Sequence, residues 1–442
     1  MQLPASPIRR LLTKMLRQAL DASHAGKALC RAIQKDGEVL TIGSCRYDLR
    51  AYERVVVVGA GKATATMARA IEPLLGRRLH RGLVIVKYGH AVPTRRIIVK
   101  EAGHPIPDRA GQAATQELLA LTSSLADRDL LIVLLSGGAS SLMPAPVRGV
   151  TLADKQRVTR QLLRCGASIG EINTVRKHLS EVKGGRLAAS TKATTITLIL
   201  SDVLGDDVSA IASGPTAPDP TTYREAVDCL KRYRLWSSAP RSVRTYLEQG
   251  RQGRHAETPK TGAPLFQKIH HEIIGNNELA LAALTSTARS TGLRTILRPA
   301  LTGEARVAGA HVGSLARNIL AHREPIANPC CLVAGGETTV TVKGSGMGGR
   351  AQEFAVAAAQ SIDGLPNVWV AAIGTDGTDG PTDVAGALIS GETWNRARRM
   401  GVDLSAALKR NDTYPALKRL RCQIKTGPTG TNVNDLYLLF VL

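Results

Sequence analysis

Short, continuously apolar runs alternate with helix-like segments along most of the chain. The apolar runs lie at Val55–Val58, Gly82–Val86, Leu130–Leu135, Thr195–Leu200, Cys331–Ala334, Val368–Ile373 and Leu436–Val441. Runs of this kind indicate strands that are buried on both faces, as in a parallel sheet. Apolar residues recur at helical spacing in Thr64–Leu75, Arg109–Leu125, Asp154–Cys165, Glu278–Thr291 and Gln352–Ser361. The alternation is typical of βαβ units and predicts an α/β fold.

The length of the chain predicts two domains. A chain of 442 residues exceeds the size at which one hydrophobic core keeps growing. Residues 236–265 are polar, charged and without strand character, and we place the connection between the domains there. We therefore expect a Rossmann-like domain at residues 1–237, with a parallel sheet covered by helices on both faces. A smaller α/β domain is expected at residues 238–442.

The chain is strongly basic, with 58 lysines and arginines against 36 aspartates and glutamates and a formal charge of +22. Such a charge attracts anions in general. The basic residues form short scattered clusters, and none is interleaved with aromatic residues for base stacking. No zinc-finger or ribonucleoprotein pattern is present either. The clusters are therefore interpreted mostly as solvated helix faces, and no nucleic acid is expected as a partner, with nucleic-acid binding as the minority alternative.

Cysteine usage and hydropathy predict a cytoplasmic protein. The seven cysteines are odd in number and form no C-x-x-C pair, which fits a reducing compartment and argues against a structural zinc. No apolar run approaches the ~20 residues needed to cross a bilayer, so no membrane association is expected. Residues 1–20 are basic and amphipathic and predict a surface helix, not a signal peptide. The oligomeric state stays open, with a homodimer as one option.

Several predicted strands end in loops rich in Gly, Ser or Asp, and ligands of open parallel sheets bind at these carboxyl ends. In the first loop, Gly59 and Gly61 would let the backbone approach a phosphate at a helix start, with Lys62 as a cation beside it. A dinucleotide fingerprint requires glycine where Thr64 stands and an acid where Lys87 ends the next strand. A Walker A loop is not satisfied either. A tight turn with a solvent-exposed lysine is the alternative interpretation.

The loop after Leu130–Leu135 contains Ser136, Gly137 and Gly138, whose N–H groups could form a nest for an anion. A nucleophile elbow would need a final glycine where Leu142 stands, so serine hydrolase chemistry is disfavoured. A strand-to-helix turn capped by a serine explains the same residues.

Two further segments of the first half carry polar groups with candidate roles. A helix is predicted over Glu171–Ala189, and it places Asn173 and Arg176 on one side. A solvated basic face is the ordinary explanation, and an anion site is the alternative. Asp202 follows the predicted strand Thr195–Leu200, where a carboxylate could hold a metal or orient a hydroxyl. A helix or turn cap is its alternative role.

In the second half, glycines again flank the apolar segments. The loop around Arg350 precedes a predicted helix and could offer N–H groups and a guanidinium to a polyphosphate. A hairpin tip with a flexible linker is the alternative. The candidate ligand-binding residues around Arg350 and after Cys331–Ala334 are Gly335, Gly336, Glu337, Gly348 and Gly349.

The loop at Gly374–Gly386 concentrates three aspartates in a basic chain. Asp376, Asp379 and Asp383 follow an apolar run and alternate with glycines and threonines. Carboxylates and backbone N–H groups in one loop favour a metal–phosphate ligand. The spacing does not fit an EF-hand, because Thr378 stands where an acid or asparagine is required. Which of the three aspartates contacts a ligand stays open.

Taken together, these segments resemble the class II glycerate kinases (glycerate 2-kinases), whose C-terminal part is called the MOFRL domain. The resemblance runs in order over nearly the whole chain. It rests on GAGKA 59–63, SGGASSL 136–142, INTVRKHLSEVKGGRLA 172–188, SDVLGDDVSAIASGPT 201–216, GGETTV 335–340, GGRAQE 348–353, GTDGTDGPTDVAGA 374–387 and TGTNVNDLY 429–437. Ala351, Leu204 and Ser168 depart from the family pattern, but none of them removes a candidate catalytic group.

The resemblance implies a two-domain kinase that binds ATP and D-glycerate in an interdomain cleft and phosphorylates the 2-hydroxyl of glycerate with Mg²⁺. By this likeness Lys62 and Arg350 are the main catalytic cations, with Asp202 beside them. Asp202 and Asp379 are expected to bind Mg²⁺, and Asp376 to join the nucleotide site with the glycines named above. Clamping cations suit this reaction, because its transition state is loose and strongly anionic.

Members of the same family have often carried the label hydroxypyruvate reductase. An NAD(P)-dependent hydroxypyruvate reductase is therefore the alternative function. It would require the dinucleotide fingerprint and the ribose-binding acid, which are missing at Thr64 and Lys87.

Overall fold

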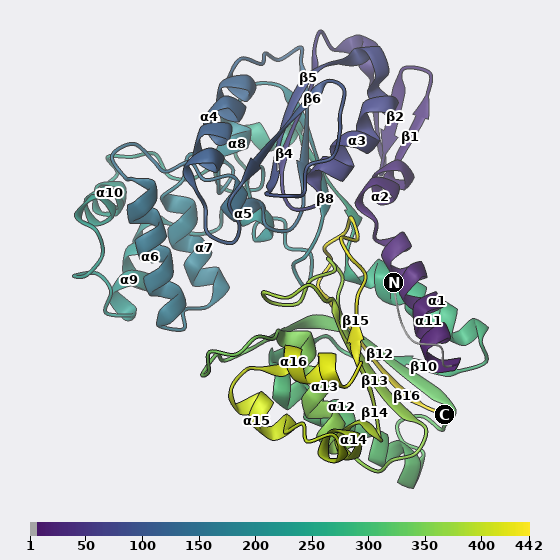
Figure 1. The fold of residues 1–442 in the computed structure, drawn as a ribbon. Coiled ribbons are helices and arrows are strands. Elements are labelled where there is room, and N and C mark those ends of the chain that lie inside the picture. The colour runs from purple at the N-terminus through teal and green to yellow at the C-terminus, as the bar shows by residue number, and fades with distance from the viewer. Residues whose placement is uncertain (1–6) are drawn as a thin grey trace. The chain divides into compact units, whose positions relative to one another are not determined.

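The structure, a computed structural model, describes residues 7–442. They form two compact units (Figure 1). The central unit is Ala25–Ile274, and the terminal unit combines the described residues up to His24 with Gly275–Leu442. The division falls after Ile274 and not at the expected residue 237, because residues 238–274 are still part of the central unit. There, α10 (Arg241–Arg251) packs on α9 (Tyr223–Arg232), and β9 (Ile269–Gly275) extends the central sheet.

The central unit contains a six-stranded sheet with the order β6-β5-β4-β7-β8-β9. Besides β9, its strands are β4 (Val55–Ala60), β5 (Leu79–Lys87), β6 (Ile97–Ala102), β7 (Leu130–Leu135) and β8 (Thr194–Leu200). All pairs from β6 to β8 are parallel, which confirms the Rossmann-like sheet predicted from the apolar runs. Every residue of β4 and β7 is buried.

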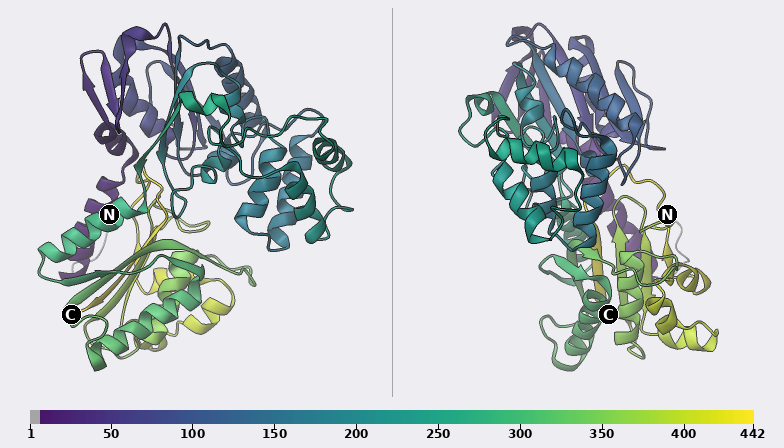
Figure 2. Two further views of the ribbon diagram at one scale, coloured as in Figure 1. Left: turned by 180° about the vertical axis from the view of Figure 1, so that it is seen from behind. Right: turned by 90° about the vertical axis from the view of Figure 1, so that its left-hand side faces the viewer.

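Helices lie on both sides of this sheet (Figures 1 and 2). On one side α3 (Thr64–Leu75) packs on α2 (Ala25–Ala32), and on the other α4 (Arg109–Ser123) covers side chains of β4, β5 and β7. Two short helices, α5 (Ala139–Leu142) and α8 (Arg186–Ala189), lie in the connection from β7 to β8. A small antiparallel sheet precedes β4 and consists of β1 (Ile33–Asp36), β2 (Val39–Ile42) and β3 (Cys45–Asp48).

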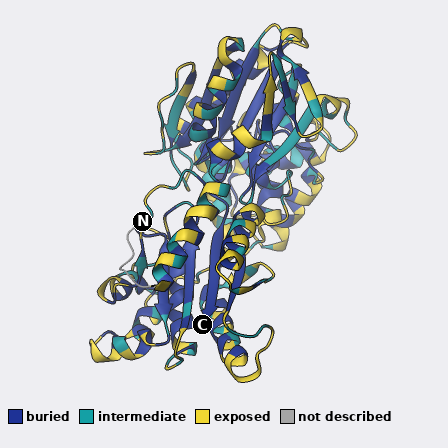
Figure 3. Ribbon diagram, turned by 90° about the vertical axis from the view of Figure 1, so that its right-hand side faces the viewer, coloured by how far each residue is buried: buried dark blue, intermediate teal, exposed yellow. Residues whose placement is uncertain are grey.

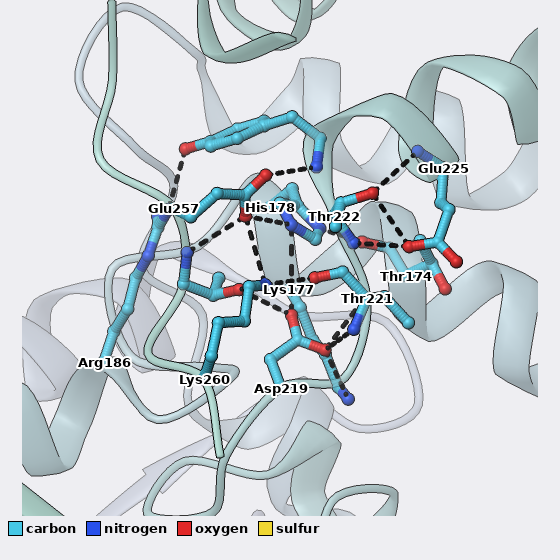
Figure 4. Close-up of polar contacts among 12 residues, drawn as sticks. Thr174, Lys177, His178, Arg186, Asp219, Thr221, Thr222, Glu225, Glu257 and Lys260 are labelled. Carbon is cyan, nitrogen blue, oxygen red and sulfur yellow. Dashed lines mark hydrogen bonds and ion pairs between the residues drawn. The ribbon is translucent and has the colours of Figure 1, made fainter. Parts of the chain in front are cut away.

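A separate group of helices in the central unit, α6 (Leu152–Arg164), α7 (Ile169–His178), α9 and α10, has its own hydrophobic cluster. A polar network ties α7 to the loop before β9 (Figure 4). Within it, the buried Asp219 accepts hydrogen bonds from Lys177 Nζ at 3.2 Å and Thr258 Oγ1 at 3.0 Å. His178 lies beside it, with Nε2 3.2 Å from Glu257 Oε2 and the ring edge-on to Tyr223. These contacts fix α7, and with it Asn173 and Arg176, against the rest of the unit.

Glu257→Gln is expected to lower the free energy of unfolding by about 1 kcal/mol at neutral pH, the usual size for one hydrogen bond. Burial tends to raise the pKa of Glu257, but hydrogen bonds from His178 and the Tyr223 N–H outweigh it and hold the pKa at about 2. Because this pKa is lowered, the carboxylate stabilises the fold above the ordinary glutamate pKa of about 4.3. The stabilisation is lost as the pH falls towards 2. Solvent reaches part of the side chain and limits the effect.

Urea unfolding of the wild type and Glu257→Gln at pH 7 and pH 3 measures this difference. Glu117→Gln, on the surface, is the control, because Glu117 forms an exposed ion pair with Lys100. A difference that grew as the pH fell would contradict the assignment.

The terminal unit contains a mixed sheet with the order β10-β12-β16-β13-β14-β15, and β11 pairs with β12. Its strands are β10 (Arg294–Leu297), β11 (Leu301–Glu304), β12 (Cys330–Thr339), β13 (Val368–Gly374), β14 (Gly386–Ser390), β15 (Gln423–Ile424) and β16 (Asp435–Val441). Because β16 runs antiparallel to both β12 and β13, the parallel arrangement expected from their apolar runs is wrong here.

Helices on both faces explain why these strands are apolar throughout although the sheet is mixed. One face is covered by α12 (Ala305–His322), α13 (Arg350–Ser361), α14 (Thr393–Arg399), α15 (Leu404–Lys409) and α16 (Thr413–Arg419). From the other, α11 (Asn277–Ser290), paired with α1 (Pro7–Ala22), contacts β10 and β12. Figure 3 shows the central strands of this sheet, β12, β13, β14 and β16, mostly in the buried colour. The expected N-terminal helix is present as α1, and residues 1–6 of that prediction lie outside the described residues.

No helix in residues 7–442 combines the length and the apolar character that a membrane crossing requires.

Candidate functional site

In the central unit, the loop after β4 is fixed against the loop after β7. The two strands pair in parallel up to their last residues, so both loops start side by side. Lys62 N donates to Gly137 O at 2.8 Å, and Ala63 N donates to Ser136 Oγ at 3.1 Å. Ser136 Oγ also lies 3.0 Å from Thr64 Oγ1. Ser136 therefore holds the start of α3, next to the half-buried Lys62.

Two glycines allow this close packing of loops. Gly61 has a φ of +141°, and a Cβ there would lie 2.1 Å from Ser136 Oγ. Gly138 has a φ of +91°, and its Cβ would lie 3.0 Å from the His104 ring and 3.3 Å from Lys62 Cγ. Both positions therefore require glycine. The two turns bring Lys62 and His104 to the start of α5.

Two further candidate residues lie along the same strands. Gly59 is part of β4, where a Cβ would come 2.2 Å from Leu134 O, so packing inside the sheet accounts for this glycine. Asp202 follows β8, the neighbour of β7, and is half-buried. Because β4, β7 and β8 are parallel neighbours, Lys62, Ser136 and Asp202 follow strands that end at the same edge of the sheet.

A row of polar side chains leads from α5 to α7, and we call it the serine–asparagine row (Ser140, Ser213 and Asn173). Ser140 Oγ lies 2.7 Å from Ser213 Oγ, which in turn donates to Asn173 Oδ1 at 3.2 Å. Ser213 and Asn173 are buried. The row connects the Ser136–Gly138 loop with the helix that carries Arg176.

The single helix predicted over Glu171–Ala189 is wrong in its second half. α7 ends at His178, and only a short helix, α8, follows. Gly184 and Gly185 have φ values of +58° and +77°, which lie outside the right-handed helical region. Arg176 lies in the last turn of α7 and is half-buried, and burial lowers its pKa.

In the terminal unit, Arg350 begins α13 and is held by two carboxylates. Its Nε and Nη2 donate to the two oxygens of Asp435 at 2.7 and 3.0 Å, and its Nη1 donates to Glu337. Glu337 also accepts a hydrogen bond from Asn434 Nδ2 at 3.0 Å. Burial tends to lower the pKa of Arg350, but the charges of Asp435 and Glu337 raise it. Arg350 is therefore a permanently charged and oriented group.

Asp435 is a site residue that the sequence interpretation missed. It begins β16 and is buried, and burial raises its pKa to about 7 against the opposing effect of Arg350. Tyr437 OH donates to its Oδ2 at 3.0 Å, and Thr338 Oγ1 lies 3.0 Å from the same hydroxyl. The signal available in the sequence was an aspartate directly before a fully apolar run.

The glycines expected to bind a nucleotide in this unit are explained by packing. Gly335 and Gly336 lie inside β12, which continues to Thr339, so the expected loop is part of a strand. A Cβ on Gly335 would lie 1.7 Å from Asn277 Oδ1, and one on Gly336 would lie 2.1 Å from a backbone oxygen of β11. A Cβ on Gly348 would lie 2.3 Å from a hydroxyl of α16.

Asp379 caps the N-terminus of α13. Its Oδ1 accepts from Ala351 N at 3.1 Å, and its Oδ2 accepts from the backbone and side-chain N–H groups of Gln352 at 2.9 and 3.0 Å. Gly349 makes room for it, because a Cβ there would lie 2.3 Å from Asp379 Cγ. Burial raises the pKa of Asp379. The helix start that was expected to face a polyphosphate thus already holds a carboxylate.

The other two aspartates of the 374–386 loop have different surroundings. Asp376 is half-buried, and its Oδ1 accepts from the N–H and the hydroxyl of Thr378 at 3.0 and 3.1 Å, which shapes the turn. Asp383 is exposed and accepts from Tyr414 OH and Lys425 Nζ, both at 2.7 Å. The three aspartates thus form a turn, a helix cap and a surface ion pair.

The two carboxylates expected to bind Mg²⁺ have different surroundings. Residues 7–442 contain no group of three or more His, Cys, Asp or Glu side chains that could hold a metal ion. Mg²⁺ is often held by one or two carboxylates and the substrate phosphates, so a single carboxylate can suffice. Asp379 does not fit, because both of its oxygens accept hydrogen bonds from α13. Asp202 follows β8 at the edge that carries Lys62 and stays the carboxylate predicted for this role.

Two family models match the chain. Residues 11–248 match a domain of unknown function, DUF4147, and residues 330–435 match the MOFRL family. The chain is 40% identical over 439 residues to the glycerate 2-kinase of Pyrococcus horikoshii, which covers 99% of this chain and 98% of the relative. It is 42% identical over 394 residues to an Agrobacterium vitis protein with the provisional name hydroxypyruvate reductase, covering 88% of this chain and 87% of the relative. The crystal structure of glycerate kinase from Thermotoga maritima aligns with a TM-score of 0.84 and 38% identity, covering 98% of this chain and 99% of the other.

Proposed function

Because the chain belongs to the class II glycerate kinase family, whose C-terminal part is the MOFRL domain, we propose that it transfers a phosphoryl group from ATP to the 2-hydroxyl of D-glycerate. The products would be 2-phosphoglycerate and ADP. The attacking hydroxyl oxygen forms a bond to phosphorus, the bond to the leaving oxygen of ADP breaks, and the hydroxyl proton is released.

The orientation of Arg350 is the observation that carries this proposal. Its guanidinium is fixed by the two hydrogen bonds that it donates to Asp435, and nearby carboxylates keep it charged. A fixed cation suits a loose, anionic transition state, because catalysis of phosphoryl transfer depends mainly on positioning and on charge stabilisation. Lys62, at the glycine-bounded start of α3, is the second proposed cation.

Asp202 is proposed to orient the glycerate hydroxyl or to hold Mg²⁺. The chemistry that Mg²⁺ supplies in such sites is neutralisation of the charge on the phosphates. Asp202 lies after β8, at the sheet edge that also carries Lys62. Asp379 is not part of the proposal, because its cap on α13 uses both oxygens.

The proposal includes a site shared by the two units, in an interdomain cleft. Lys62 belongs to the central unit and Arg350 to the terminal unit. A single phosphoryl group can contact both cations only if both units contribute to one site. Non-additive effects of replacing the two cations would support this arrangement.

Turnover with ATP and D-glycerate is the test of the proposed function. We expect ADP formation that depends on both substrates and on Mg²⁺, followed in a coupled assay. Phosphorus NMR of the product is expected to show 2-phosphoglycerate, and a 3-phosphoglycerate signal would overturn the proposed regiochemistry. The absence of glycerate-dependent ADP formation would overturn the function.

Reduction of hydroxypyruvate is the competing function, since two relatives carry that provisional name. A dinucleotide site would need glycine at Thr64, which is buried and in contact with Ser136 Oγ. It would also need an acid at the end of β5, where Lys87 stands. NAD(P)H oxidation with hydroxypyruvate in the absence of ATP would establish the reductase instead.

A cytoplasmic location is also proposed. The seven cysteines are all free thiols, as expected in a reducing compartment. Cell fractionation with kinase activity as the marker tests it.

A further inference from the structure

Lys183 is a buried lysine whose ammonium group has no partner in the protein. The residue is 1% exposed, and its Nζ forms no hydrogen bond within the described residues 7–442. An ammonium group buried without compensation is strongly unfavourable. Burial, together with the charge of Arg176, lowers the pKa of Lys183 to about 7. A ligand that supplies the missing negative charge would explain why a lysine is present here.

The backbone holds Lys183 beside the serine–asparagine row. Gly184 and Gly185 follow it with positive φ values, and Gly184 N donates to Ser213 O at 3.0 Å. A Cβ on Gly185 would lie 2.9 Å from a backbone oxygen, so the turn requires glycine there. The paired glycines, which interrupt the predicted helix, thus fix the position of Lys183.

The cations around Lys183 are of two kinds. Most are bonded to protein oxygens: Lys155 Nζ (Leu179 O, 3.2 Å), Arg186 (Ser180 O and Tyr223 OH, 2.8 Å each) and Lys177 Nζ (Asp219 Oδ1, 3.2 Å). Arg176 differs, because burial lowers its pKa and no carboxylate opposes that effect. The exposed Glu181 contributes negative charge to the cluster through its effect on Lys155. Lys183 is therefore buried without a hydrogen-bond partner, and the positive charge of the half-buried Arg176 acts on it.

We propose that Lys183 and Arg176 bind the carboxylate of the hydroxy-acid substrate. The inference rests on the proposed function, which supplies glycerate as that substrate. Two cationic side chains with N–H donors are the groups that bind a carboxylate through charge-assisted hydrogen bonds. A phosphate of the nucleotide is the other source of such an oxyanion. The burial of Lys183 favours the smaller molecule, because a triphosphate keeps more of its charge in solvent.

The serine–asparagine row gives this carboxylate site a connection to the proposed catalytic lysine. From Ser213, next to Lys183, the row reaches Ser140 in α5. α5 starts at Gly138, whose missing side chain leaves Lys62 Cγ close to the backbone. A hydroxy acid held by its carboxylate at Lys183 would therefore direct its hydroxyl group towards the edge of the sheet where Lys62 and Asp202 lie.

A pH dependence of substrate binding follows from this site. Lys183 must be protonated to bind a carboxylate, and its pKa of about 7 means that part of the protein carries a neutral Lys183 above pH 7. The bound carboxylate raises that pKa, so binding at pH 8 takes up a proton and the KM for glycerate rises with pH. The other charged groups near the site are Arg176, Lys155, Arg186, Lys177, Asp219 and Glu181. Three of these cations, Lys155, Arg186 and Lys177, already donate hydrogen bonds to protein oxygens.

Lys183→Met is the variant that tests the site. We expect the KM for glycerate to rise about 10- to 100-fold, the effect of losing a charged hydrogen bond, while the KM for ATP stays unchanged. The rise of the glycerate KM between pH 7 and pH 8.5 should also disappear. Because methionine removes an unpaired buried charge, the variant without ligand should be at least as stable as the wild type. A purely structural lysine would give the opposite stability result.

Lys155→Met is the matched control, because Lys155 is also buried but donates to a backbone oxygen. It should leave both KM values within about twofold. Isothermal titration of the wild type with glycerate at pH 8, in buffers of different ionisation enthalpy, detects the proton uptake without any variant.

The outcomes separate the two proposals. An unchanged glycerate KM in Lys183→Met, or no proton uptake, overturns the carboxylate site while wild-type turnover leaves the kinase function intact. A raised KM for ATP alone would assign Lys183 to a nucleotide phosphate and overturn the carboxylate assignment. If the wild type does not turn over glycerate, the proposed function fails, and the proposed ligand fails with it.

Discussion

Arg350→Ala and Lys62→Ala are each expected to lower kcat by about a thousandfold, the scale of cations that stabilise a transferring phosphoryl group. Arg350 has the geometry for this role, because Asp435 fixes its guanidinium with hydrogen bonds at 2.7 and 3.0 Å. Lys62 lies at the start of α3 in a loop that two glycines and Ser136 hold in place. A coupled ADP assay at saturating ATP and glycerate measures both losses.

The two variants differ in their expected stability. Arg350→Ala leaves the buried Asp435 without its cation, which costs about 3 kcal/mol. The combined change Arg350→Ala with Asp435→Asn removes the unpaired charge and should restore most of the stability without restoring turnover. The contacts that hold the loop of Lys62 are made by its backbone N–H and by Ser136, and both stay in Lys62→Ala, so the melting temperature of this variant should fall less than that of Arg350→Ala.

A double-mutant cycle tests whether both cations act on one group. If they do, the loss of kcat in the double variant should be much smaller than the product of the two single losses. A phosphoryl group that has lost one cation is no longer held in position for the other, so the second replacement costs less. Lys100→Ala is the control, since Lys100 forms an exposed ion pair with Glu117 at 3.2 Å. Near-wild-type turnover in either single variant would refute the clamp, and fully multiplicative effects would refute a shared phosphoryl group.

Local apolar patterns predicted the strands and helices well. β7 and α3 have the bounds expected from the sequence, because a strand or helix buried on a whole face leaves a continuous or periodic signal. The direction of β16 could not be predicted, since helices on both faces make parallel and antiparallel strands equally apolar. The small sheet β1–β3 was missed because its strands are only half-buried and carry charged residues.

The candidate site was predictable only where its residues lie just after an apolar strand. Lys62, Ser136 and Asp202 were found because each directly follows an apolar strand. Asp435 escaped notice although it is bonded to Arg350, since 85 residues separate the two along the chain. Lys183 was not predicted as a site residue for another reason. A lysine in a basic segment is expected to be exposed to solvent, and only the structure shows that this one is buried.

In the glycine-rich loops the sequence predicted ligand contacts at positions where packing within the protein explains the glycine. Gly335 and Gly349 were expected to contact a ligand, and each instead makes room for a polar side chain of the protein. A glycine can indicate that another group lies close to the backbone, but a single sequence does not show whether that group belongs to a ligand or to the protein. In this chain the approaching groups are Asn277 and Asp379.

Asp379→Ala is expected to lower the free energy of unfolding by about 3 kcal/mol or more. The change leaves two backbone N–H groups of α13 buried without an acceptor, and each unsatisfied donor costs about 1–3 kcal/mol. The side-chain amide of Gln352 also loses Asp379 and keeps Thr382 Oγ1 at 3.2 Å as its acceptor. It also removes a negative group from the positive end of the helix. Asp379→Asn keeps the shape and one acceptor oxygen, so its loss should be smaller. Urea unfolding measures both values.

The same variants decide between a helix cap and a metal ligand. If Asp379 only caps α13, Asp379→Asn assayed below its unfolding temperature should require the same Mg²⁺ concentration for half-maximal turnover as the wild type. Asp383→Ala is the control for the loop, because its exposed ion pair with Lys425 should contribute little to stability. A stable Asp379→Asn with a strongly raised Mg²⁺ requirement would mean that the carboxylate leaves the helix to bind the metal. Loss of stability with an unchanged Mg²⁺ requirement would establish the cap and leave Asp202 as the carboxylate proposed for the metal.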